Sequence, residues 1–255
     1  MRIALCFSGQ PRFIDKVAPI IKENIIGDYN VDVFAHLWFD EELQSKPYKF
    51  GGAGGWRNQR IESNAIDDFK KQYNPKDLLV QSSKKFLNSY LSDNYEASLK
   101  RYKRGAIDNP EEPDFAIRDV NNITSYYYSL MKVCLLKKEY EYEHDFKYDM
   151  VIKIRTDSIV HNKIDYESFA KVKNTVFYSG NQGQSDGMIN DWFNFGSSKT
   201  MDVFMSPFPV LDKCIDACMD QTNGAWCCEL IHKKMVDFFK INSQPLPIHI
   251  TLPRF

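Results

Sequence analysis

The sequence predicts an α/β fold in which a mixed, mostly parallel β-sheet is flanked by helices. Three observations predict this class. The chain opens with the patterns of a strand, a helix and a second strand, an order that places two parallel strands in one sheet. A further buried strand follows the longest helical pattern of the chain. Finally, 255 residues with 43% hydrophobic side chains can bury a sizeable core.

The first 81 residues contain five predicted elements. Arg2–Ser8 is a short apolar run that stops before a glycine, as buried strands do. Apolar residues at helical spacing then predict a helix that starts near Asp15 and ends before Gly27. Val31–Phe39 is the second predicted strand. Apolar positions 61, 65, 69 and 73 predict another amphipathic helix, and Asp77–Gln81 a third strand.

The rest of the chain alternates between polar segments and regular elements. Residues 44–58 are predicted as a glycine-rich loop and residues 82–118 as a partly helical insertion. Asn121–Glu143 is the longest predicted helix, with an apolar stripe and a charged distal half. The other predicted elements are the strands Tyr148–Ile154, Thr175–Ser179, Trp192–Phe195 and Ile248–Leu252 and the helices Lys199–Met205, Val210–Met219 and Trp226–Lys240.

Charge and composition restrict the classes of function. The chain has 33 Lys and Arg against 34 Asp and Glu, a formal net charge of -1. This balance disfavours a protein that binds nucleic acid through overall charge, so we expect no nucleic-acid partner. No apolar run is long enough for a transmembrane segment or a signal-peptide core, while peripheral membrane association stays open. The six cysteines are therefore expected to be reduced thiols.

The candidate site lies where the predicted strands end. In open α/β sheets, ligands bind outside the carboxyl ends of the strands. The first strand ends with small and polar residues suited to a phosphate, the second near an aromatic ring and the fourth in an Arg-Thr-Asp motif. The residues predicted to bind a ligand there are Ser8, Gly9, Gln10, Arg12, Trp38, Arg155 and Asp157. The first turn is neither a dinucleotide fingerprint nor a P-loop.

Asp157 has two interpretations. A carboxylate at the rim of a sheet suits a hard divalent cation that bridges diphosphate oxygens. Alternatively, Arg155 and Asp157 form an ion pair or turn cap at the strand end. Both interpretations are open on the residues alone.

Five segments, in this order, give the sequence a resemblance to a known family. They are SGQPRF at 8–13, DVFAHLW at 32–38, NNITSYYYSLMKVCLLKKEYE at 121–141, YDMVIKIRTD at 148–157 and DWFNFGSSKTMDVF at 191–204. Together they resemble small glycosyltransferases of polysaccharide-synthesis loci and of some large viruses and phages. The resemblance implies one GT-A-like domain over residues 1–255, with a nucleotide-sugar-binding half (about 1–160) and an acceptor-binding half (about 161–255). It also implies a cytoplasmic enzyme of a bacterium or a virus-infected cell.

The same resemblance implies a cofactor and its ligands. Such enzymes use Mn²⁺ or Mg²⁺ held at a D-x-D motif, of which only Asp157 is present here. A C-terminal histidine that completes the metal shell corresponds to His249. Alternatively, Arg155 neutralises the leaving diphosphate itself. The acid of an x-E-D segment corresponds to Glu229, although leucine replaces the following Asp.

Sugar transfer by inversion also needs a carboxylate that accepts the proton of the acceptor hydroxyl. Glu229 and Asp191 are the two candidates. Glu229 could instead face solvent near a helix start, and Asp191 could instead cap a strand. Asn122 and Ser125 are predicted to contact the donor because they lie near the expected start of a helix, whose positive end favours phosphate.

Aromatic and cysteine-rich segments allow further interpretations. At most two of Tyr126, Tyr127 and Tyr128 can face a cleft, because successive helical residues point 100° apart. Trp38 either stacks on a nucleobase or is buried. A zinc site is disfavoured because the cysteines and His232 lack the usual spacing. The basic run 100–104 has acidic residues close by, which is typical of a solvated face.

Three functions therefore compete. The first is a glycosyltransferase that uses a nucleotide-sugar donor and a glycan or polysaccharide acceptor. The second is a nucleotidyltransferase-like enzyme, although SGQPRF is a poor match to its glycine-rich loop. The third is a glycan- or nucleotide-binding module without activity, which the single aspartate of the Arg-Thr-Asp motif keeps open.

Overall fold

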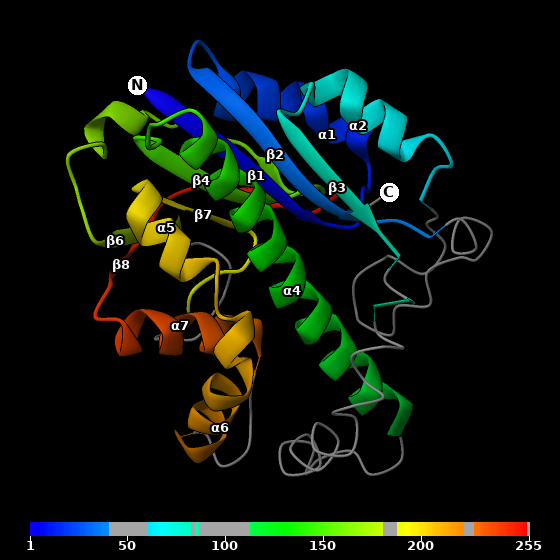
Figure 1. Cartoon of the computed structure of the whole chain (residues 1–255), viewed down its shortest axis with the longest axis vertical. Coiled ribbons are helices and arrows are strands. Elements are labelled where there is room, and N and C mark those ends of the chain that lie inside the picture. The colour runs from blue at the N-terminus through cyan, green and yellow to red at the C-terminus, as the bar shows by residue number, and fades with distance from the viewer. Residues whose placement is uncertain (41–60, 83–84, 87–112, 181–187, 222–226, 254–255) are drawn as a thin grey trace.

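The computed structural model describes residues 1–40, 61–82, 85–86, 113–180, 188–221 and 227–253 (Figure 1). Its strands are β1 (Arg2–Gly9), β2 (Asn30–Trp38), β3 (Asp77–Gln81), β4 (Met150–Arg155), β5 (Ile159–Val160), β6 (Thr175–Ser179), β7 (Phe193–Gly196), β8 (Asn242–Leu246) and β9 (Ile250–Thr251). Its helices are α1 (Ile14–Ile21), continued by a π-helical turn (Lys22–Ile26), α2 (Ala65–Tyr73), α4 (Pro113–Glu143), α5 (Ser198–Phe204), α6 (Leu211–Gln221) and α7 (Cys228–Phe238). Short 3₁₀ turns span Tyr166–Ser168 and Phe208–Val210.

A seven-stranded sheet in the order β3-β2-β1-β4-β7-β6-β8 forms the centre of the molecule. β7 runs antiparallel to both neighbours, whereas the other strand pairs are parallel. The predicted α/β class, with a mixed and mostly parallel sheet, is confirmed. β2 and β3 extend from one side of β1 and β4 from the other, so the strand order reverses at β1. Such a point is where open α/β sheets bind ligands.

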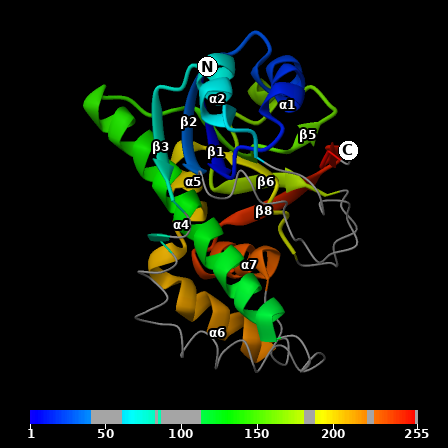
Figure 2. The ribbon, with the colours of Figure 1, turned by 90° about the vertical axis from the view of Figure 1, so that its right-hand side faces the viewer.

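Side chains of β1 alternate between two hydrophobic clusters. Ile3, Leu5 and Phe7 pack with α1 and α2, while Ala4 and Cys6 pack with α4 through α7. The sheet thus forms the middle layer of three. α1 and α2 lie side by side, away from α6 and α7 (Figure 1), and α4 runs past the sheet as one long helix (Figure 2).

A buried charged network fixes the distal half of α4. The Lys137 ammonium donates to Ser198 Oγ at 2.8 Å and Glu141 Oε2 at 3.0 Å, and it also contacts the Asp202 carboxylate. Glu141 Oε1 accepts hydrogen bonds from the Ser198 hydroxyl at 2.6 Å and the Tyr148 backbone N–H at 3.0 Å. Burial alone would lower the pKa of Lys137, but the charge of Asp202 raises it. The network joins α4, α5 and the segment leading into β4.

Several predicted boundaries are wrong. α4 begins at Pro113 rather than Asn121, because proline at a first helical position loses no intrahelical hydrogen bond. β8 was not predicted, since NSQPL is polar and contains proline, which an edge strand tolerates. The expected final strand, Ile248–Leu252, shortens to β9, which pairs with the unpredicted β5 in a separate two-stranded sheet.

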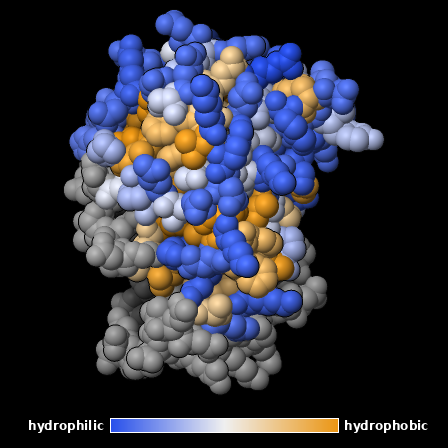
Figure 3. Space-filling view, turned by 90° about the vertical axis from the view of Figure 1, so that its left-hand side faces the viewer, coloured by the Kyte–Doolittle hydropathy of each residue, from blue (hydrophilic) through white to orange (hydrophobic). Residues whose placement is uncertain are grey.

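Some predictions concern residues outside the described part of the chain. These are the loop 44–58, most of the insertion 82–118 with its basic run, and Trp226 at the predicted start of the last helix. Within the described residues, no helix is both long and apolar enough to span a bilayer. In Figure 3, hydrophobic side chains reach the surface in patches between hydrophilic bands.

Candidate functional site

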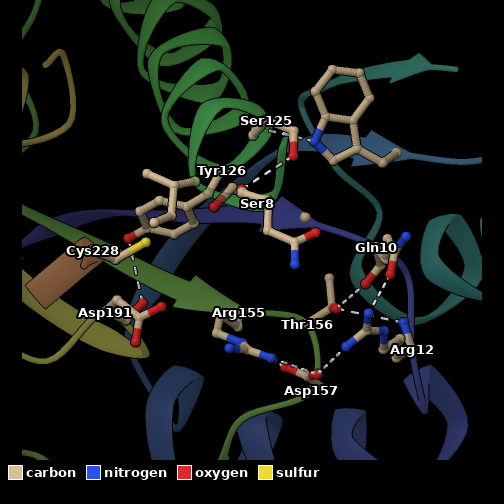
Figure 4. A pocket seen from close by; sticks show the side chains of 14 residues that line it. Ser8, Gln10, Arg12, Ser125, Tyr126, Arg155, Thr156, Asp157, Asp191 and Cys228 are labelled. Atoms are coloured by element: carbon tan, nitrogen blue, oxygen red, sulfur yellow. Dashed lines mark hydrogen bonds and ion pairs between the residues drawn. The ribbon is translucent and has the colours of Figure 1, made fainter. Parts of the chain in front are cut away.

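A cavity of about 290 Å³ lies at the carboxyl ends of β1 and β4, beside α4 (Figure 4). It is lined by Ser8, Gly9, Gln10, Arg12, Trp38, Asn122, Ile123, Ser125, Tyr126, Arg155, Thr156, Asp157, Asp191 and Cys228. Every residue predicted to bind a donor is in this lining. Of the two predicted bases, Asp191 lines the cavity and Glu229 does not.

The loop after β1 forms one side of the cavity. Gly9 has a φ of 115°, a backbone conformation that other residues rarely adopt, so the chain can leave the strand sharply. The Gly9 N–H donates to Ser129 Oγ on α4 at 3.2 Å. The Gln10 carbonyl accepts a hydrogen bond from the Thr156 hydroxyl, and Gln10 Oε1 accepts one from Arg12. The loops after β1 and β4 therefore support each other.

Two arginines surround Asp157. Arg155 binds it side-on, with Nε 2.9 Å from Oδ1 and Nη2 3.0 Å from Oδ2. Arg12 Nη1 lies 3.5 Å from the same Oδ2. Burial alone would raise the pKa of Asp157, but the charges of Arg155 and then Arg12 hold it below its usual range. Of the two interpretations of Asp157, the ion pair with Arg155 is present in the structure.

The donor set does not fit a divalent cation held by the protein. Both oxygens of Asp157 are engaged by guanidinium groups, whose charge would repel a metal ion. The predicted partner ligand, His249, is not brought to the cavity. Its ring is exposed and stacks on His161 with centroids 4.6 Å apart. Among the described residues, no group of three or more His, Cys, Asp or Glu side chains is arranged to hold a metal.

A buried lysine supports the opposite side of the cavity. Lys153 on β4 is 0% exposed, and its ammonium donates to the Asp191 backbone carbonyl. The ammonium also lies 4.9 Å from the ring centroid of Tyr126. Burial lowers the pKa of Lys153 to about 8. The Tyr126 hydroxyl is 2.8 Å from His232 Nε2, so β4, α4 and α7 meet behind the cavity wall.

The two predicted bases differ in access. Asp191 presents its carboxylate to the cavity, opposite Arg12 and Gln10 (Figure 4). Glu229 follows Cys228 at the start of α7 and lies outside the cavity lining. Burial, followed by the negative charge of Asp191, raises the pKa of Glu229. Asp191 is therefore the carboxylate that a ligand in the cavity can reach.

The prediction that the N-terminal end of a helix lies at the cavity is wrong. Because α4 starts at Pro113, Asn122 and Ser125 lie inside the helix, where backbone N–H groups are already bonded. Both residues line the cavity, so their side chains rather than a helix dipole are available to a ligand. Of the three tyrosines, Tyr126 lines the cavity and Tyr127 is fully buried.

Trp38 is buried within an aromatic group at the edge of the cavity. It is 4% exposed, stacks on Tyr128 with centroids 5.6 Å apart, and donates from Nε1 to the Ser125 carbonyl at 3.2 Å. His36 contacts it edge to face at 4.6 Å. The face of the Trp38 ring that meets Tyr128 is thus already occupied by protein.

His36 gives the fold a dependence on pH. Its ring bonds Ser129 Oγ at 2.7 Å and Gln81 Oε1 at 2.8 Å, and burial lowers its pKa to about 4. In the unfolded chain the pKa of His36 returns to about 6.5, so protonation below that pH favours the unfolded state. The contribution of neutral His36 to the free energy of unfolding is therefore complete above about pH 6.5 and is lost as the pH falls toward 4. We expect the free energy of unfolding to fall by about 2–3 kcal/mol between pH 7 and 4.5 through this group.

Urea unfolding across this pH range, in the parent and in His36→Asn, measures the contribution. The variant should lose less stability on acidification than the parent. His232, whose pKa is also lowered by burial, is present in both proteins, so its contribution cancels in the comparison. Parallel pH profiles for the two proteins would refute the assignment.

Sequence reasoning missed several residues of the site. Thr156 and Cys228 line the cavity, but each has a side chain too common to stand out. Lys153 carried the clearest signal, because a lysine within the apolar run MVIKI either breaks the strand pattern or is buried with a partner. Tyr126 was recognised only as one of three equivalent rings.

Comparison with known proteins adds one relationship. No curated protein matches the chain. A family model described as a domain of unknown function, DUF7796, matches residues 119–248, just over half of the sequence. The matched region contains Arg155, Thr156, Asp157 and Asp191, but not the loop after β1. The chain belongs to the DUF7796 family.

Proposed function

We propose that this protein is a glycosyltransferase that moves a sugar from a nucleotide-sugar donor to a glycan or polysaccharide acceptor. One observation carries the proposal: the cavity at the strand-order reversal is lined by the Asp191 carboxylate, by Arg12 opposite it and by Arg155 between the two. A departing diphosphate needs positive charge beside it, and an attacking hydroxyl needs an acceptor for its proton. The sequence resemblance to small glycosyltransferases points to the same reaction.

The proposed reaction is a direct displacement at the anomeric carbon of the donor sugar. The acceptor hydroxyl oxygen forms the new bond to this carbon while its proton passes to the Asp191 carboxylate. The bond from the carbon to the diphosphate breaks, and its electron pair leaves with the diphosphate oxygen. We assign the stabilisation of this charge to Arg12 and Arg155, which both line the cavity.

The surroundings of the cavity suggest how the donor is placed. Asn122 and Ser125 offer polar side chains from α4, and Tyr126 offers a ring that a sugar or base can contact. We place the reaction in the cytoplasm, because four of the six cysteines are buried and none of the six, all of which lie in the described part of the chain, forms a disulfide.

A panel of nucleotide-sugar donors tests the proposal. Each donor is incubated with the protein and Mn²⁺, and release of free nucleoside diphosphate is measured. We expect slow release from one donor or a few, because water can replace the missing acceptor. The matching nucleoside diphosphate should also raise Tm, as any ligand of the native state does.

Two results would contradict glycosyl transfer. If a nucleoside diphosphate raises Tm but no donor is cleaved, even with a mixture of glycan acceptors, the protein is a binding module. If pyrophosphate is released from a nucleoside triphosphate and a sugar phosphate, the protein is a nucleotidyltransferase.

A further inference from the structure

The guanidinium contacts of Asp157 disfavour a cation beside this carboxylate. This carboxylate is 3% exposed, and each of its oxygens has a guanidinium nitrogen at 2.9–3.0 Å from Arg155. To bind a metal ion, Asp157 would have to release this side-on contact and leave Arg155 next to a doubly charged ion. Such like-charge contacts oppose binding strongly in a buried site.

Arg12 brings a second guanidinium group to Asp157. Its Nη1 lies 3.5 Å from Asp157, a longer contact than those of Arg155, and its side chain is 18% exposed. It enters from the β1 loop, whereas Arg155 ends β4, so the two guanidinium groups approach Asp157 from neighbouring strands (Figure 4). Planar guanidinium groups suit the oxygens of a diphosphate, and Arg carries its charge at every physiological pH.

Asp157 then has a different role from a metal ligand. Its two oxygens fix the plane of the Arg155 guanidinium, leaving Nη1 of Arg155 outside the side-on pair. The Thr156 hydroxyl donates a hydrogen bond to the Gln10 carbonyl and so links the two loops. The arginines are thus positioned before a ligand enters, which reduces the cost of ordering them on binding.

We infer that Arg12 and Arg155 hold the diphosphate of the ligand without a protein-bound divalent cation, and that Asp157 is a positioning residue for Arg155. This inference rests on the proposed function for the identity of the ligand as a nucleotide sugar. The anion site itself follows from the geometry of the three side chains.

Calorimetric titration of the whole protein tests the inference, with inorganic pyrophosphate, UDP, GDP and ADP as probes. Each titration is done in EDTA and again with Mn²⁺. We expect pyrophosphate to bind with affinities that agree within about threefold in the two buffers. Arg12→Gln should weaken binding at least tenfold in EDTA, whereas Lys16→Gln, an equal change of charge on the exposed start of α1, should change it less than threefold.

The Arg155 side needs two variants, because Arg155→Gln alone leaves Asp157 buried without its main partner. The double variant Arg155→Gln with Asp157→Asn removes both charges, so it should fold. Its affinity for pyrophosphate should be at least tenfold weaker than that of the parent. Asp157→Asn alone should change affinity by the same factor with EDTA and with Mn²⁺. If Asp157 were instead a metal ligand, Asp157→Asn would remove only the part of pyrophosphate binding that depends on Mn²⁺.

The outcomes separate this inference from the proposed function. If nucleoside diphosphates bind only with Mn²⁺ and Asp157→Asn abolishes that binding, the inference fails and glycosyl transfer stands. If pyrophosphate binds in EDTA but none of the nucleoside diphosphates binds, the anion site stands and donors built on UDP, GDP or ADP are excluded. If no probe binds in either buffer, both fail.

Discussion

Lys137→Met is expected to lower the free energy of unfolding by about 3–5 kcal/mol. Lys137 is 0% exposed and contacts Glu141, Asp202 and the Ser198 hydroxyl. Methionine fills similar space but removes the buried cation that contacts both the Glu141 and the Asp202 carboxylates. Urea unfolding at pH 7 measures the loss, and a destabilisation below 1 kcal/mol would contradict the buried network.

A matched control comes from the same carboxylate. Lys147 contacts Glu141 Oε2 at 2.8 Å, but its side chain is 64% exposed. Lys147→Met should therefore cost less than about 1 kcal/mol, because water screens that pair. If Lys137→Met does not fold, adding Glu141→Gln and Asp202→Asn should recover a folded protein, since no uncompensated charge then remains.

Asp191→Asn is expected to slow the release of nucleoside diphosphate from the best donor by 100-fold or more, because loss of a general base costs about 10²–10⁴ in rate. Asparagine keeps the size of the side chain and its place in the cavity lining. The substitution keeps the backbone carbonyl of Asp191, which, rather than the carboxylate, holds Lys153. Binding of the nucleoside diphosphate should therefore change less than about threefold. Initial rates and calorimetry on the same protein samples measure both effects.

Glu229→Gln is the control for this experiment. Glu229 lies outside the cavity lining, and burial and the charge of Asp191 raise its pKa. We expect a loss of less than about tenfold in rate, through its effect on Asp191. A larger loss for Glu229→Gln than for Asp191→Asn would assign the base to Glu229 and reverse our interpretation of the cavity.

The loops that end β1 and β4 were predictable because each follows a short apolar strand. In a parallel sheet, such ends meet at one edge, so Gln10, Arg12, Arg155 and Asp157 could be grouped without coordinates. His249 could not be placed in this way. It precedes a two-residue strand that pairs with β5 instead of joining the main sheet, and two residues carry no readable alternation.

Contacts between charged residues far apart in the chain could not be predicted from the sequence either. Lys137 and Glu141 belong to the charged distal half of a helix, and only the packing of α5 shows that both are buried. The start of α4 was misplaced because proline after acidic residues indicates a loop as readily as a first helical turn. Both errors concern partners or boundaries, while the type of element was correct.

The pairing of β1 with β4 also bears on how the protein forms during synthesis. Ile3 lies beside Met150, so the two central strands are separated by most of the first 150 residues. At a synthesis rate of about 5–20 residues per second, β4 would follow β1 on the ribosome by roughly 7–30 s. The apolar face and open edge of β1 are exposed to chaperones in that interval, and the distant pairing favours slow folding. The Arg12–Arg155 site can assemble only after β1 has paired with β4.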